Sequence, residues 1–217
     1  MRIIHTALVC GLIAMTGACG TEDVIHARAR STAETARMRA ALATMDDLPA
    51  GFSDRARDRW QPPFRPKKRA CRVLFDAVAG KPPQDGLGGT AAVTYQGDGI
   101  GELAGVGLAV YLGDQAADHL EELREAMGEC VTAQSGGAGQ RDRLVVSEFP
   151  IEDVGDDVEA RRLTGRVGGY PYEMHLVVAN VNHTLVALVH AGLAPPDALR
   201  TEELVRSLVR EVGSLDP

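Results

Sequence analysis

Two apolar runs near the C-terminus constrain the fold most strongly. Residues 172–181 and 184–191 are rich in Val, Leu and Ala, and only Asn182-His183 separates them. Asn adopts the positive φ that a two-residue turn requires, so the runs predict a β-hairpin. Both faces of this hairpin are apolar, with Leu176, Val178, Leu185, Ala187 and Val189 on one and Val177, Ala179, Val186 and Leu188 on the other. Strands with this pattern are buried on both sides, so we expect cover on each face.

Four further stretches predict strands, over residues 90–96, 103–112, 144–149 and 158–167. Behind Asp114, apolar residues recur at helical spacing, at Ala116, Leu120, Leu123, Met127 and Cys130. Other helices are predicted over residues 22–45 and 71–80 and after Pro195-Pro196-Asp197. Strands that follow one another through short turns indicate an α+β fold. We expect a twisted antiparallel sheet of about six strands with helices packed on one side.

The first 18 residues have the parts of a secretory signal. Arg2 supplies a positive charge, residues 3–15 form an apolar core, and small residues follow. At ~13 residues the core is too short to span a ~30 Å hydrocarbon layer as a helix. Thr16-Gly17-Ala18-Cys19 resembles a bacterial lipobox, with Thr16 where that motif prefers Leu. The resemblance implies cleavage before Cys19 and a lipid such as palmitate on Cys19; the alternative is an ordinary signal peptide that leaves Cys19 as a thiol.

The cysteine count agrees with export. Of four cysteines, Cys10 lies in the signal and Cys19 carries the lipid if the lipobox is processed. Cys71 and Cys130 remain, and an even remainder in an exported chain predicts a disulfide. Two buried free thiols are one alternative. A zinc site is another, but neither cysteine has the close Cys or His neighbour that such sites use.

Charge divides the chain at about residue 70. Residues 20–69 contain 11 Lys and Arg against 7 Asp and Glu, a net +4, and residues 70–217 contain 11 against 23, a net −12. The net charge of −7 argues against a nucleic-acid partner. A basic segment beside a lipid anchor is attracted to anionic headgroups, or is a solvated tether. We therefore divide the chain into a signal peptide (1–18), a basic helical tether (19–45) and one domain (46–217).

Several landmarks together resemble the extracellular sensor domain of PknH-like actinobacterial receptor kinases, a domain that also occurs on lipoproteins. They are the Asp47-Leu48-Pro49-Ala50-Gly51-Phe52 entry, Cys71 at the start of a helix, Cys130 at the end of the next, the Gly155-Asp156 turn, and the final hairpin and helix. The resemblance covers roughly residues 40–215. It implies a twisted antiparallel sheet around a cleft suspected to bind a ligand, and it brings no catalytic residues. The kinase domains carry two disulfides, whereas this chain has cysteines for one.

Signals for catalysis or a cofactor are weak. Residues 99–104 fit a loose Gly-x-Gly-x-x-Ala pattern, but a strand is predicted after it where a dinucleotide site needs a helix. A nucleophile motif of the Gly-x-Ser-x-Gly type is absent from the sequence. We expect no catalytic residue, no metal and no cofactor.

His175 and His190 are the polar pair of interest. A turn at Asn182-His183 places them opposite each other, with Cβ atoms ~5 Å apart. We expect helices of the core to cover one face of the hairpin. Residues 40–70, with Phe52, Trp60 and Phe64, should cover the other, which we call the second face. His175 and His190 would then lie at the rim of a ligand cleft where this cover is incomplete.

These expectations define a function. The chain is predicted to be a lipid-anchored, non-catalytic ligand-binding or sensor-like domain on the extracytoplasmic face of the cell membrane. Its partners would be that membrane and an unknown small or cell-envelope ligand. A structural or protein-interaction surface lipoprotein is the alternative, and an exported hydrolase is the third possibility.

Overall fold

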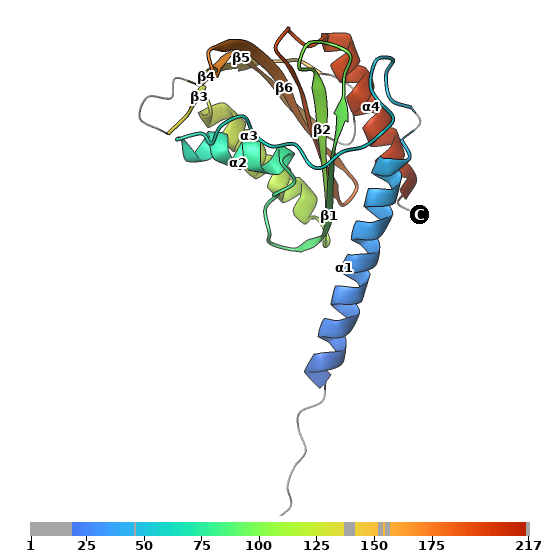
Figure 1. Ribbon diagram of the computed structural model, residues 1–217. Helices are drawn as coiled ribbons and strands as arrows, with labels where there is room; N and C mark the ends of the chain where they lie inside the picture. The colour runs from blue at the N-terminus through green and yellow to red at the C-terminus, as the bar shows by residue number, and fades with distance from the viewer. Residues whose placement is uncertain (1–18, 46, 137–141, 152–153, 155–156, 216–217) are drawn as a thin grey trace, which may run out of the picture.

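The computed structural model describes residues 19–45, 47–136, 142–151, 154 and 157–215 (Figure 1). Its helices are α1 (Cys19–Ala43), α2 (Arg69–Val78), α3 (Gln115–Glu129) and α4 (Ala198–Leu215). Its strands are β1 (Leu87–Gln96), β2 (Leu103–Tyr111), β3 (Thr132–Gln134), β4 (Arg143–Glu148), β5 (Asp157–Val167), β6 (Tyr170–Val181) and β7 (Thr184–Gly192). They form one antiparallel sheet in the order β1-β2-β7-β6-β5-β4-β3. The predicted α+β class is confirmed.

The sheet has seven strands in the described residues, one more than the six predicted. The addition is β3, which has three residues and pairs only with the first half of β4. So short a strand shows no periodic pattern, and for this reason the sequence did not indicate it.

The predicted hairpin is confirmed as β6 and β7, which lie at the middle of the sheet. Asn182 takes a φ of 54° in the turn. The register pairs His175 with His190 and Val177 with Leu188. Nearly every side chain of the hairpin from Met174 to Ala191 is therefore buried outside the turn, as its two apolar faces require.

Helices cover both faces of the sheet, so the expectation of helices on one side is wrong (Figure 1). On one face, α2 and α3 pack against Leu176, Val178 and Leu185. On the other, α4 and the end of α1 pack against Val177 and Leu188. The physical reason is the hairpin itself, because two apolar faces at the centre of one sheet require a helical layer on each.

The aromatic residues of the 40–70 segment divide between the two faces. Phe52 lies with α4 on the second face, as expected. Trp60 and Phe64 instead pack on Phe75 of α2, with ring centroids 6.1 and 5.7 Å apart, so for these two the prediction is wrong. The segment changes face because it passes the free edge of β1, where Arg57 forms a bridge with Thr94.

A glycine on β2 makes room for Trp60. A Cβ atom on Gly105 would lie 2.6 Å from the Cβ atom of Trp60 and 2.8 Å from a methyl group of Val189. Since carbon atoms cannot approach so closely, only glycine at this position lets the indole lie against the sheet.

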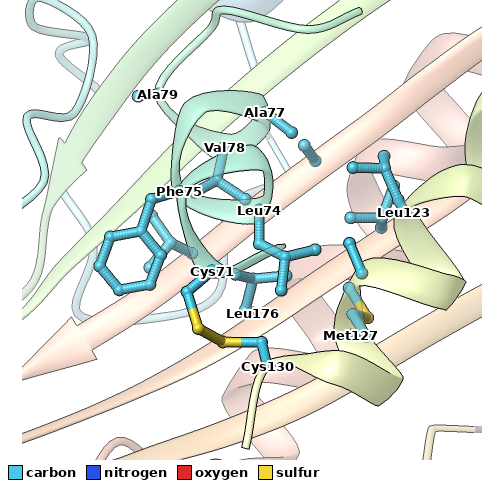
Figure 2. Packing of buried hydrophobic residues seen from close by; sticks show 14 of the residues in the cluster. Cys71, Leu74, Phe75, Ala77, Val78, Ala79, Leu123, Met127, Cys130 and Leu176 are labelled. Carbon is cyan, nitrogen blue, oxygen red and sulfur yellow. A yellow bond between two sulfur atoms is a disulfide. The ribbon is translucent and has the colours of Figure 1, made fainter. Parts of the chain in front are cut away.

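The predicted disulfide is confirmed. Cys71 in α2 and Cys130 at the end of α3 are bonded, with an S–S distance of 2.07 Å and Cα atoms 5.0 Å apart. Figure 2 shows the bridge beside Leu74, Phe75 and Met127, where α2 meets α3 over the sheet. Both sulfur-bearing residues are fully buried. The bond thus joins the two helices of this layer inside the hydrophobic core.

The end of α1 docks on β1. Its apolar residues Met38, Ala41 and Leu42 are buried there, as is Met45 just after the helix. The hydroxyl of buried Tyr95 donates a hydrogen bond to the carbonyl of Leu42. Figure 1 shows the first half of α1 running away from the sheet. No helix among the described residues is long and apolar enough to cross a membrane.

Candidate functional site

The two histidines singled out in the sequence do meet, in the layer between the sheet and α4. His175 on β6 and His190 on β7 are paired residues, with ring centroids 6.2 Å apart and nearly perpendicular. Both side chains are 0% exposed. A buried imidazole needs polar partners, so what surrounds these rings decides their state.

The hydroxyl of Thr201 on α4 bridges the two rings. Its Oγ1 lies 2.7 Å from Nδ1 of His175 and 2.8 Å from Nδ1 of His190. The hydroxyl also lies 3.0 Å from the carbonyl oxygen of Asp197, to which it can donate. One hydroxyl has one proton and two lone pairs, so it can accept from two donors while donating once. Thr201 therefore ties β6, β7 and the start of α4 together.

His190 continues the network to a carboxylate. Its Nε2 lies 2.9 Å from Oε1 of Glu102, which is 6% exposed. Glu102 also accepts from the guanidinium of Arg200 at 3.0 Å and from the backbone N–H of Gly99 at 2.8 Å. We call His175, His190, Thr201 and Glu102 the histidine cluster.

Arg200 connects this cluster to the entry segment of the domain. Its guanidinium donates to Asp98 and to the carbonyl oxygen of Ala50, and it lies over the ring of Phe52 at 4.7 Å. Gly51 makes the approach possible. It has a φ of +93°, and a Cβ there would lie 2.5 Å from the guanidinium of Arg200. Its conformation and the close contact both call for glycine.

The far side of His175 makes no hydrogen bond among the described residues. Its ring stacks on Phe149 at 4.1 Å. Its Nε2 is buried without a hydrogen-bond partner, 3.5 Å from a carboxylate oxygen of Glu173. Arg162 of β5 lies over the same phenyl ring, at 5.3 Å from its centroid.

Burial sets the protonation of both histidines. It lowers the pKa of His175 to about 4, with further lowering from the positive charge of Arg162 and from His190 when that ring is protonated, against a weaker opposing effect of Asp197. Burial also lowers the pKa of His190, although hydrogen bonding to Glu102 works in the other direction. Neutral rings satisfy the geometry. His175 donates Nδ1–H to Thr201, His190 donates Nε2–H to Glu102, and the single hydroxyl proton of Thr201 then goes to Nδ1 of His190 in place of the carbonyl oxygen of Asp197.

Thr201, His190 and Glu102 have the order of a nucleophile, base and acid. Solvent and substrates have no access to these groups, however, because Thr201 and His190 are 0% exposed. The histidine cluster does not line the four cavities that described residues form beside α1, α2 and the edge of β1. A substrate could not reach Thr201 in this conformation, and the contacts of Thr201 form a buried polar network that links β6, β7 and α4.

A cavity between the second face and its helices lies at the turn end of the β6–β7 hairpin, away from the histidine cluster. It has a volume of about 150 Å³ and is lined by residues of α1, β2 and α4 together with His183 and Thr184. Ligand pockets for small molecules usually measure ~300–1,000 Å³. His175 and His190 are wholly buried, so neither stands at an open rim in this structure. Their part in ligand binding stays a prediction.

The structure describes no group of three or more Cys, His, Asp or Glu residues placed to hold a metal ion in the ranges given above. Residues 97–101 form the turn that joins β1 and β2 as a hairpin, with Glu102 at its end, and a strand follows the Gly-x-Gly-x-x-Ala pattern as expected. The side chain of Cys19 lies outside what the structure describes, so its lipidation stays a prediction.

Sequence reasoning paired the histidines but missed their partners. Thr201 carried a usable signal, because it stands on the stripe of Leu204, Val205, Leu208 and Val212 that faces the core. A polar residue in such a stripe needs a buried partner. Glu102 and Arg200 gave no such signal, since they are 98 residues apart and meet only through the fold.

Among the solved structures that resemble this chain are two mycobacterial proteins. The extracellular domain of PknH from Mycobacterium tuberculosis is similar with 12% identity and a TM-score of 0.46, over 63% of this chain and 70% of that one. A putative uncharacterized protein from Mycobacterium smegmatis is similar with 21% identity and a TM-score of 0.39, over 66% and 74%. The sequence matches no protein-family model and no curated protein.

Proposed function

We propose that this protein is a non-catalytic, sensor-like domain held on the extracytoplasmic face of the cell membrane by a lipid on Cys19. The observation that carries the proposal is the Cys71–Cys130 disulfide inside the core. Structural disulfides persist in oxidising compartments and are rare in the cytosol. This agrees with the signal-like residues 1–18 and with the lipobox-like Thr16-Gly17-Ala18-Cys19.

The shape of α1 suits an anchor. The helix begins at Cys19, has 25 residues and docks on β1 through its C-terminal half. At ~1.5 Å per residue it is roughly 37 Å long. A lipid at its first residue would hold the domain away from the bilayer, because α1 extends away from the sheet as a helical stalk (Figure 1).

A second candidate function is a structural or protein-interaction lipoprotein without a small ligand. It is favoured by the packing of the sheet, because helices fill both faces and leave about 150 Å³ between the second face and its cover. A small ligand would then have to bind in the open clefts of the surface. The third possibility, an exported hydrolase, has no support from the buried Thr201.

Replacing Cys19 tests the anchor. We expect Cys19→Ala to remain unprocessed or to be released into the medium, and to lose labelling by radioactive palmitate, because no other residue of the predicted mature chain is placed to carry the lipid. The measurement is membrane fractionation with fatty-acid labelling of the full chain. Cys10→Ala is the matched control, since Cys10 lies in the signal, and it should label like the wild type. A Cys19→Ala chain that still labels and still sediments with membranes would contradict the proposal.

A further inference from the structure

An open cleft of about 680 Å³ lies at the free edge of β1, between α1 and the segment that follows it. Arg39 lines the cleft from α1, and Arg57 and Arg59 line it from the segment that follows α1. All three side chains are exposed. Among the described residues of its lining, Asp58 alone is acidic. We call this site the arginine cleft.

The three guanidinium groups are unpaired. In the ranges that the structure describes, none of them has a side-chain hydrogen bond or a carboxylate within ion-pair distance. Other arginines of the chain find such partners. Arg124 contacts the carboxylates of Glu121, Asp157 and Glu159, and Arg200 contacts those of Asp98 and Glu102. In a protein of net charge −7, three neighbouring arginines that make no ion pair, with Asp58 as the one acidic residue among the described lining residues, form a distinct positive surface.

The edge of β1 adds a backbone donor. Thr94 uses its outward N–H and carbonyl to bridge Arg57, and the outward N–H of Thr90 contacts the hydroxyl of Thr35 at 3.4 Å. Backbone groups alternate along a strand, so the N–H of Ala92, midway between them, also points to this edge. Ala92 lines the cleft, and no backbone bond from it to another segment is present among the described residues.

From these contacts we propose that the arginine cleft binds a phosphate group of the kind found in phosphate esters. Guanidinium groups recognise phosphate through paired N–H donors, and a free backbone N–H is a common additional contact. The cleft is wider than a bare phosphate ion requires, so there is space for the organic part of an ester. The source is either a soluble phosphate ester or the headgroup of an anionic phospholipid, and the proposal does not depend on the lipid at Cys19.

Titration calorimetry on the full chain in nonionic detergent tests the site. The probes are inorganic phosphate, glycerol 1-phosphate, and mixed micelles that contain either phosphatidylglycerol or, as the zwitterionic control, phosphatidylcholine. The variant is Arg39→Gln/Arg57→Gln/Arg59→Gln. The matched control is Arg55→Gln/Arg65→Gln/Arg69→Gln, which removes the same charge from exposed arginines outside the cleft.

We expect the cleft variant to weaken binding about tenfold, and the control variant about twofold or less, because several exposed charges act together. Binding should also weaken with added salt. Binding of glycerol 1-phosphate assigns a soluble ester, and binding of phosphatidylglycerol micelles alone assigns a headgroup. If the triple variant loses its circular dichroism spectrum, the single variants Arg39→Gln and Arg59→Gln replace it, each with about a twofold to threefold effect.

Two results would overturn the proposal. If both triple variants weaken binding equally, the wild type attracts anions through diffuse positive charge and the cleft is no site. If the wild type binds neither inorganic phosphate nor glycerol 1-phosphate, and binds phosphatidylglycerol micelles no better than the phosphatidylcholine control, the unpaired arginines have no phosphate ligand. Neither result bears on palmitate labelling at Cys19, so failure of this proposal is distinguishable from failure of the proposed function.

Discussion

Removing the Cys71–Cys130 disulfide should lower the free energy of unfolding by about 4 kcal/mol, according to the chain-entropy relation for a loop of this length. The two cysteines are 59 residues apart, and the loop between them contains α2, β1, β2 and α3. Without the bond the unfolded chain gains the conformational freedom of that loop, while the folded core keeps its apolar contacts. Urea unfolding of the oxidised wild type and of Cys71→Ala/Cys130→Ala measures the difference.

Two controls accompany this experiment. Wild-type protein reduced with dithiothreitol should unfold at a urea concentration close to that of the double variant, because both lack the same link. Cys10→Ala should leave the stability unchanged, since Cys10 lies in the predicted signal. Two thiols open to alkylation in the folded, exported wild type would show that the bond is absent. An unchanged midpoint in the double variant would show that the bond contributes nothing to stability.

Periodicity was enough to predict most of the fold. The strands β1, β2 and β4 to β7 were expected because their apolar residues form continuous runs or alternate, and α3 because its stripe repeats at helical spacing. Two features were out of reach. β3 has three residues, and it exists because the chain after Cys130 meets the start of β4. The placement of Trp60 depends on Gly105, which lies 45 residues further along the chain and leaves space on the sheet.

The sequence predicted the pairing of the two histidines in the candidate site, but not their burial. Once the turn was placed at Asn182-His183, the pairing of His175 and His190 followed from counting residues along two strands. Their burial did not follow, because it depends on how α4 lies across the sheet and brings Thr201 between the rings. Sequence spacing inside one hairpin is fixed by geometry, whereas the packing of a helix against it is a property of the whole core.

Lowering the pH should destabilise the protein through His175. The pKa of this residue is about 4 in the folded protein, whereas an unfolded histidine has a pKa of about 6.5. Between these values the unfolded state binds more protons, so stability is fully present above pH 6.5 and is lost as the pH falls toward 4. Between pH 7.5 and pH 5 the loss from His175 amounts to about 2 kcal/mol. His190 adds to it in the same direction, since burial lowers its pKa as well.

The groups around His175 explain why it resists a proton. Phe149 covers its ring, the guanidinium of Arg162 repels a positive charge, and the Nδ1–H donated to Thr201 is already present in the neutral form. Glu173 and Asp197 are the acidic groups nearby, and they do not outweigh burial.

Urea unfolding at pH 7.5 and pH 5 of the wild type, His175→Gln and His183→Gln tests this origin of the pH dependence. Glutamine does not titrate, so His175→Gln should lose about 2 kcal/mol less than the wild type between the two pH values, whatever its stability at pH 7.5. His183 is exposed in the β6–β7 turn, so His183→Gln should follow the wild type. The comparison within each protein removes any constant cost of the substitution. Equal losses in the wild type and His175→Gln would show that the acid sensitivity arises elsewhere in the chain.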